Sequence, residues 1–90
     1  MRTTYYGDDS FLFEFEDQEG YILLHCKVYK WKLSTLKKQI DILGKFLNDM
    51  EKKGVDVVYA ATKNLKFASL LGGEYIMNHN KYEVVRWVIR

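Results

Sequence analysis

The sequence predicts a single α/β domain built on a mixed β-sheet, with the element order β-β-α-β-α-β-β. Three observations support this fold class. Phenylalanines alternate with other residues from Phe11 to Phe15, apolar residues recur every three or four positions between Leu33 and Met50, and a β-branched run follows over residues 55–61. A period of two is typical of a strand and a period near 3.6 of a helix. Ninety residues leave room for one core, so we expect one domain over residues 1–90.

The first hairpin is expected to begin at about residue 11. Phe11, Phe13 and Phe15 fall on one face of its first strand, and Glu14 and Glu16 fall on the other. Turn-forming residues follow at positions 17–20, and a second strand is expected over residues 21–29, inside the sheet. Residues 1–10 are predicted to form a loose amino-terminal arm.

An amphipathic helix is expected from about residue 34 to residue 53. Ser34 or Thr35 can cap its start, and Gly54 suits the left-handed position after its last turn. The width of its apolar stripe fits a helix that lies on a sheet. Together with the strands, the helix is expected to place these residues in the core: Leu36, Ile40, Leu43, Leu47, Phe13, Leu24 and Val57.

The strand over residues 55–61 is expected to lie beside the strand over residues 21–29 and parallel to it, because a helical crossover separates the two. A short helix over residues 65–71 ends at Gly72 and Gly73. Two further strands, over residues 74–77 and 82–89, are joined by a polar turn at residues 78–81. These elements complete the mixed sheet.

The composition limits the classes of function. A formal net charge of +2 is too small to indicate nucleic-acid binding, and no apolar run approaches the roughly 18 residues of a membrane span. A lone Cys26 agrees with a reducing compartment, so we expect a cytoplasmic protein. The first twenty residues are acidic overall and residues 27–53 are basic, which predicts that these two segments attract each other.

Basic and aromatic residues interleave over residues 27–32, just before the expected helix. Such a segment can neutralise phosphates or stack on planar groups, and a helix amino terminus adds to the attraction of anions. The candidate residues for a phosphate-bearing ligand are Lys30, Lys32, Ser34 and Thr35. The candidate residues for a protein partner are Lys27, Tyr29 and Trp31. The alternative is a strand end with solvated lysines, where Trp31 covers the first turn of the helix.

No catalytic or metal-binding residue is predicted. His25 and Cys26 are adjacent in an expected strand, so their side chains point to opposite faces and cannot meet. Two histidines and one cysteine lack the spacing of a zinc site. Glu14 and Glu16 are expected on a solvated face. Cys26 is therefore interpreted as a structural thiol.

The element order, with the stretch Leu65-Lys66-Phe67-Ala68-Ser69-Leu70-Leu71-Gly72-Gly73-Glu74 at the end of the short helix, resembles the carboxy-terminal half of the GNAT N-acetyltransferase superfamily. The resemblance covers about residues 11–90 and is strongest to the short, divergent GNAT-like proteins that phages encode. It implies an acyl-CoA pyrophosphate at the strand-to-helix turn. The chain departs from the family there, because residues 29–36 contain no glycine. Ala68 or a neighbour stands where many members have a catalytic tyrosine, and the family's amino-terminal acceptor half is missing.

Two functions remain. The first is a catalytically silent, GNAT-like domain without a cofactor, which binds a host protein or another macromolecule and can inhibit it. The alternative is a minimal N-acetyltransferase that uses acetyl-CoA. The departures from the family favour the first. Neither nucleic acid nor a membrane is expected as a partner, and a homodimer is left open.

Overall fold

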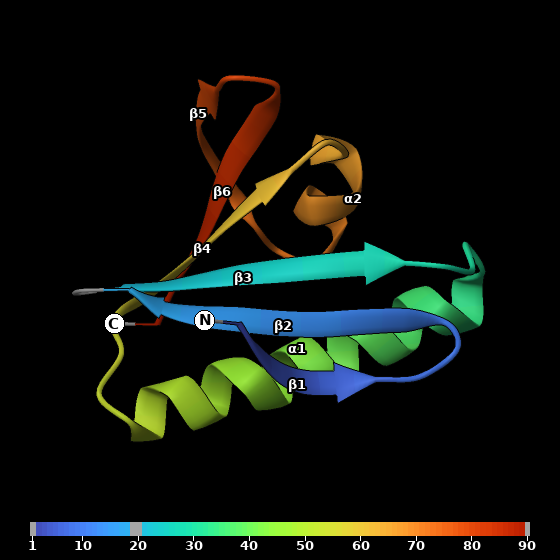
Figure 1. Cartoon of the computed structure of the whole chain (residues 1–90), viewed down its shortest axis with the longest axis horizontal. Coiled ribbons are helices and arrows are strands. Elements are labelled where there is room, and N and C mark those ends of the chain that lie inside the picture. Colours follow the sequence, from blue (N-terminus) through green and yellow to red (C-terminus); the bar gives the residue numbers. More distant parts are fainter. Residues whose placement is uncertain (1, 19–20, 90) are drawn as a thin grey trace.

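The structure is a computed structural model that describes residues 2–18 and 21–89. Its elements are, in chain order, β1 (Thr3–Gly7), β2 (Phe11–Gln18), β3 (Tyr21–Val28), α1 (Leu33–Lys52), β4 (Val57–Thr62), α2 (Leu65–Leu70), β5 (Glu74–His79) and β6 (Tyr82–Val88). The six strands form one sheet in the order β1-β2-β3-β4-β6-β5 (Figure 1). The predicted small α/β fold with a mixed sheet is therefore confirmed.

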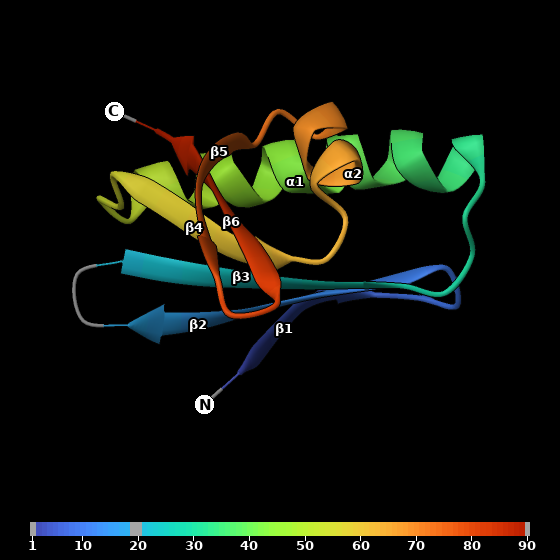
Figure 2. The ribbon, with the colours of Figure 1, turned by 90° about the horizontal axis from the view of Figure 1, so that it is seen from above.

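The sheet is antiparallel except at its centre, where β3 and β4 are parallel neighbours. Ile22 lies opposite Val58 and Leu24 opposite Ala60. This pairing was expected, because α1 carries the chain from the end of β3 back to the start of β4. Both helices lie on the same side of the sheet (Figure 2). The side chains of β2, β3, β4 and β6 that face the helices form the core with α1 and Ala68 of α2.

Half of the amino-terminal arm predicted over residues 1–10 is a strand. Residues 3–7 form β1, which pairs antiparallel with β2 and adds a strand to the predicted order. Threonine and tyrosine favour extended structure, and both tyrosines of β1 contact residues of α1. The Tyr5 ring packs edge-on against Phe46, and its hydroxyl donates to Asp49 at 2.6 Å. Desolvation and the bond to this carboxylate raise the pKa of Tyr5 to about 12.

The ends of the elements differ from the prediction by a few residues. α1 begins at Leu33 after Lys32, and no side chain caps its start, so Ser34 and Thr35 lie inside its first turn. Gly54 follows the helix with φ +82°, as expected. β5 extends to His79, so the turn before β6 contracts to Asn80 and Lys81, with Asn80 at φ 58°. Residues 19–20 of the predicted first turn lie outside the described residues.

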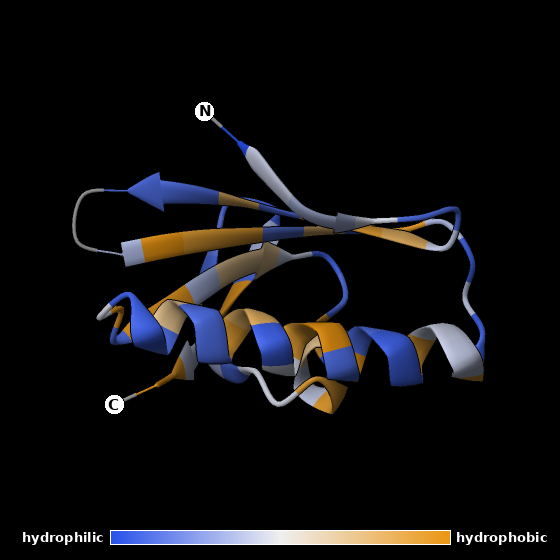
Figure 3. Ribbon diagram, turned by 90° about the horizontal axis from the view of Figure 1, so that it is seen from below, coloured by the Kyte–Doolittle hydropathy of each residue, from blue (hydrophilic) through white to orange (hydrophobic). Residues whose placement is uncertain are grey.

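The rotation of α1 about its own axis differs from the prediction. The buried positions of the helix are Thr35, Gln39, Ile42, Leu43, Phe46 and Met50. Of the residues predicted in the core, Phe13, Leu24 and Leu43 are buried. Ile40 is 49% exposed, and Leu36, Leu47 and Val57 are only partly buried. Figure 3 accordingly shows apolar residues as well as hydrophilic ones on the visible side of α1.

Contacts with the β1 side of the sheet account for this rotation. Tyr5 holds Phe46 and Asp49, while the Lys38 ammonium binds Asp8 at 2.7 Å and lies 5.2 Å from the centre of the Tyr6 ring. Side chains advance by about 100° per residue around a helix. Lys38 and Asp49 therefore occupy one flank of α1. Leu33, Leu36, Ile40 and Leu47 occupy the opposite flank, called here the α1 flank, which faces away from β1 and toward the β4, β6 and α2 side.

The predicted attraction between the acidic amino-terminal segment and the basic segment is confirmed by two ion pairs. Lys38 binds Asp8, and Lys30 binds Asp9 at 2.8 Å. Asp8 accepts further hydrogen bonds from the Tyr6 hydroxyl and from the backbone N–H groups of Ser10 and Phe11. The hydrogen bond from Lys38 contributes most, and together with these other donors it holds the pKa of Asp8 well below its ordinary value.

Asp8→Asn is expected to destabilise the protein in a manner that depends on pH. The asparagine oxygen can still accept from the backbone, but the charge that binds Lys38 is lost. Because the pKa of Asp8 is depressed in the folded state, its charge stabilises the fold above the unfolded pKa of about 3.9, and this stabilisation is lost as the pH falls further. Thermal unfolding should show a lower Tm than the parent at pH 7 and a smaller difference below about pH 4.

Asp41→Asn is the matched control, because Asp41 forms only an exposed pair with Lys45 four residues along α1. It should change Tm little at either pH. A Tm difference between Asp8→Asn and the parent that is equally large at pH 7 and in acid would contradict the assignment to the Asp8 charge.

Candidate functional site

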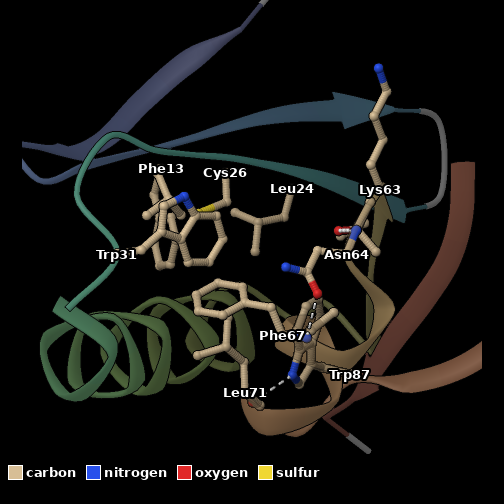
Figure 4. Close-up of a pocket in the computed structure, with 13 residues that line it drawn as sticks. Phe13, Leu24, Cys26, Trp31, Lys63, Asn64, Phe67, Leu71 and Trp87 are labelled. Carbon is tan, nitrogen blue, oxygen red and sulfur yellow. Dashed lines mark hydrogen bonds between the residues drawn. The ribbon is translucent and has the colours of Figure 1, made fainter. Parts of the chain in front are cut away.

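A cavity of about 200 Å³ lies at the carboxyl ends of β3 and β4, between the sheet and α2 (Figure 4). Phe13, Leu24 and Ala60 contribute from β2, β3 and β4, and Phe67 contributes from α2. Trp31 contributes from the loop before α1. In α/β sheets, ligands commonly bind beyond the carboxyl ends of the strands. The position of this cavity makes it the candidate functional site.

The local sequence determines where α2, which forms one wall of the cavity, begins and ends. Asn64 precedes α2 and caps it, because its side-chain oxygen accepts from the Phe67 N–H at 2.9 Å. The helix then turns Ala68 toward the sheet and ends before Gly72, at φ +90°. The indole N–H of Trp87 donates to the Leu71 carbonyl at 3.1 Å and ties the end of α2 to β6.

Trp31 lies at the cavity and remains largely accessible. Its side chain is 62% exposed, and its ring meets Phe67 edge-on with centroids 4.8 Å apart. The two other residues predicted to bind a protein partner lie elsewhere. Lys27 stands between Cys26 and Val28, which line the cavity, so it projects from the other face of the sheet. Tyr29 is exposed, and its backbone N–H donates to the Ser10 carbonyl at 2.7 Å.

The four residues predicted to bind phosphate have different surroundings. Lys30 binds Asp9, whose hydrogen bond raises the pKa of Lys30, and Thr35 is buried in the first turn of α1. Lys32 and Ser34 are exposed at the start of α1, whose first turn contains no acidic residue. Of these four residues, only Lys32 and Ser34 are both exposed and outside the ion pairs of the described residues.

Exposed apolar side chains occur on α1 and α2 as well as at the cavity. Leu33 and Ile40 of the α1 flank are 68% and 49% exposed, and Leu70 of α2 is exposed next to the cavity residue Leu71. In the sequence, the spacing of Leu33, Leu36 and Ile40 predicts the core-facing side of the helix. The same spacing marks a flank that is partly exposed, because the β1 contacts rotate other residues onto the sheet.

A buried amide lies behind the cavity and was not predicted. Gln39 of α1 is completely buried, and its amide nitrogen donates to the Cys26 sulfur at 3.4 Å. Its amide oxygen is buried without a hydrogen-bond partner in the described structure. A single glutamine among apolar helix positions gives no signal of this kind in the sequence.

The cavity offers little for proton transfer. Cys26 is exposed as a residue, but partial desolvation raises the pKa of its thiol to about 12, so the thiol stays protonated at neutral pH. His25 contacts Glu16 at 3.1 Å and does not meet Cys26, as predicted. Lys63 contributes to the lining, and its ammonium lies 5.4 Å from the centre of the Tyr82 ring. The lining fits an apolar group better than a reacting one.

No family model, curated protein or solved structure matches this chain. Among the described residues, no three or more His, Cys, Asp or Glu side chains gather as metal ligands would. Within the same residues, neither helix combines the length and the apolar composition needed to cross a membrane.

Replacement of Gln39 by methionine is expected to stabilise the fold. Methionine fills a similar volume, and it removes a buried oxygen whose missing partner costs about 1–3 kcal/mol. Gln39→Glu should act in the opposite direction, because it places a carboxylate in the same buried space. Chemical denaturation of the two variants measures both effects. A Gln39→Met protein that is markedly less stable than the parent would show that the amide oxygen has a partner.

Proposed function

We propose that this domain is a GNAT-like binding domain without catalysis, which holds a partner protein by taking an apolar side chain of the partner into the cavity beside Trp31. The observation that carries the proposal is an apolar cavity that opens next to an exposed tryptophan. Aromatic side chains at the centre of an interface commonly dominate its binding energy.

The order of elements supports the GNAT-like part of the proposal. A hairpin, a crossover helix, a parallel strand, a short helix that ends at a glycine pair, and a closing hairpin follow one another in the chain. This is the order on which the resemblance rests. The resemblance to small phage proteins makes a host protein the favoured partner. Binding at this cavity would inhibit that host protein.

The surroundings of the cavity support binding over chemistry. The resemblance places the catalytic tyrosine of many family members at Ala68 or a neighbour, and Ala68 is a buried part of the cavity wall. Exposed apolar side chains also include Leu33 and Ile40 of α1 and Leu70 of α2. An exposed apolar surface of this kind commonly marks an interaction site.

The charges around the cavity indicate an acidic partner. The segments that flank it, residues 30–38 and 63–70, contain lysines and no acidic residue. Lys30 and Lys38 are neutralised by Asp9 and Asp8. The other lysines of these segments form no ion pair among the described residues: Lys32, Lys37, Lys63 and Lys66. A partner with carboxylates around its apolar anchor complements this surface and associates faster at low salt.

One observation favours acetyl-CoA binding as the second candidate. α1 begins without a side-chain cap and without an acidic residue in its first turn, so its first N–H groups and Lys32 are available to a phosphate. The pantetheine arm of the ligand would then enter the cavity. The engagement of Lys30 by Asp9 and the burial of Thr35 weaken this alternative.

Selection from a displayed library of random peptides tests the first proposal without knowledge of the natural partner. The selected peptides should carry an aromatic or leucine anchor near Asp and Glu. Trp31→Ala should weaken their binding by about 30-fold, which corresponds to about 2 kcal/mol. Tyr29→Ala is the matched control, because Tyr29 is exposed but does not line the cavity, and it should change binding by less than about threefold.

Calorimetric titration with acetyl-CoA separates the two candidates. The proposal expects no binding. Binding that weakens with salt and in Lys32→Ala would favour the acetyl-CoA alternative, since attraction to phosphate is screened by salt. Equal losses of peptide binding in Tyr29→Ala and Trp31→Ala would contradict the role of the cavity.

A further inference from the structure

The strand β5 leaves one edge of the sheet open. It pairs with β6 on one side only, and all six of its residues are exposed, including Tyr75, Ile76 and Met77. It contains no proline or lysine, and its only charged residue is Glu74 at its start. Lysine and proline are the residues that commonly protect a strand edge from pairing. The edge at β5 is therefore suited to pair with another strand.

We propose that β5 pairs antiparallel with β5 of a second copy, so that the sheets of the two copies join. This inference is independent of the function proposed above and concerns another surface. A two-fold axis between Ile76 and Met77 places Glu74 of each copy opposite His79 of the other. It also places Tyr75 opposite Asn78. The pairing is isologous, as a symmetric dimer requires.

A bulge in β5 makes this register possible. Opposite residues in an antiparallel pair share a face of the sheet, but residues five apart in a regular strand point to opposite faces. In β5 the register with β6 shifts between Tyr75 and Met77, so Ile76 is an extra residue. Glu74 consequently lies opposite Arg86, and His79 lies opposite Tyr82.

The register with β6 shows that the two ends of β5 match. Arg86 and Tyr82 are four residues apart on β6 and share one face, so Glu74 and His79 also share it. Tyr75 lies opposite Val85, and Asn78 lies opposite Glu83, so Tyr75 and Asn78 share the other face. Both pairs that the dimer brings together are therefore on matching faces. Without the extra residue, neither pair would match.

The polar groups at the two ends of β5 also match in this register. Glu74 accepts a hydrogen bond from Arg86 at 2.7 Å, and its carboxylate is exposed at the strand edge. His79 forms no ion pair among the described residues. In the dimer each carboxylate lies between Arg86 of its own copy and His79 of the other copy, at both ends of the pairing.

Sedimentation equilibrium of the full chain tests the dimer. The parent should associate, and Ile76→Lys, which places two like charges near the axis, should raise the dimer dissociation constant by at least about tenfold. Thr4→Lys is the matched control, because it adds the same charge to β1, the strand at the other edge of the sheet. It should leave the dissociation constant unchanged, and circular dichroism should show that both variants are folded.

Substitutions at His79 test the register. His79→Glu should weaken the dimer by at least about threefold, because it opposes Glu74, while His79→Lys should leave it as tight or tighter. A parent that stays monomeric up to about 1 mM overturns the proposal. The proposal is also overturned if Thr4→Lys dissociates the dimer and Ile76→Lys does not. Equal effects of His79→Glu and His79→Lys on the dimer dissociation constant would overturn the proposed register.

Discussion

The contacts between the β1 side of the sheet and α1 are the constraint on which the rest of the structure depends. Tyr5 packs against Phe46 and binds Asp49, and Asp8 binds Lys38. On α1, Lys38 lies at least two turns before Phe46 and Asp49. A helix on a sheet can rotate about its axis at modest cost when its apolar stripe is wide. These contacts fix the rotation, so Thr35, Gln39 and Phe46 lie in the interior.

The exposed apolar surface follows from this rotation. With Phe46 turned to the sheet, Leu33 and Ile40 lie on the α1 flank and are exposed. The cavity itself depends on a second feature, the parallel pair of β3 and β4, since α2 begins directly after β4 and closes the space above it. Trp31 lies between these two features and meets α2 at Phe67. The proposed partner surface is thus a consequence of two features of the fold, the rotation of α1 and the parallel pair of β3 and β4.

Much of the fold could be predicted from the sequence, because the strongest signals were periodic. Alternating phenylalanines identified β2, and a crossover helix between two apolar strands identified the parallel pair. β1 was missed because residues 3–7 show no alternation and lead into Gly7-Asp8-Asp9, a stretch that suggests a loop. The rotation of α1 was missed because helical spacing defines a stripe without defining its centre. Phe46 and Ile42 widen the stripe on one side, and only the tertiary contact with Tyr5 selects that side.

The candidate site was predicted in part for the same reason. Trp31 was identified from its place in a basic, aromatic segment, and it lines the cavity. The attraction between the acidic and the basic segment was predicted, but the choice of Lys30 as a paired residue was not, since its partner Asp9 is twenty-one residues away in the chain. Gln39 and Phe67 gave no separate signal, because one resembles a solvated helix residue and the other an ordinary core residue. Residues of this kind acquire a role only when the topology brings β3, β4 and α2 together.

The rotation of α1 is the central claim, and methyl NMR with a soluble paramagnetic probe measures it directly. The probe relaxes the signals of side chains that reach solvent and spares those in the interior. The structure requires the methyl groups of Leu33 and Ile40 to relax much faster than those of Ile42 and Leu43. Equal protection of Ile40 and Ile42 would contradict the account, because the α1 flank would then be buried and the apolar surface beside Trp31 would not exist.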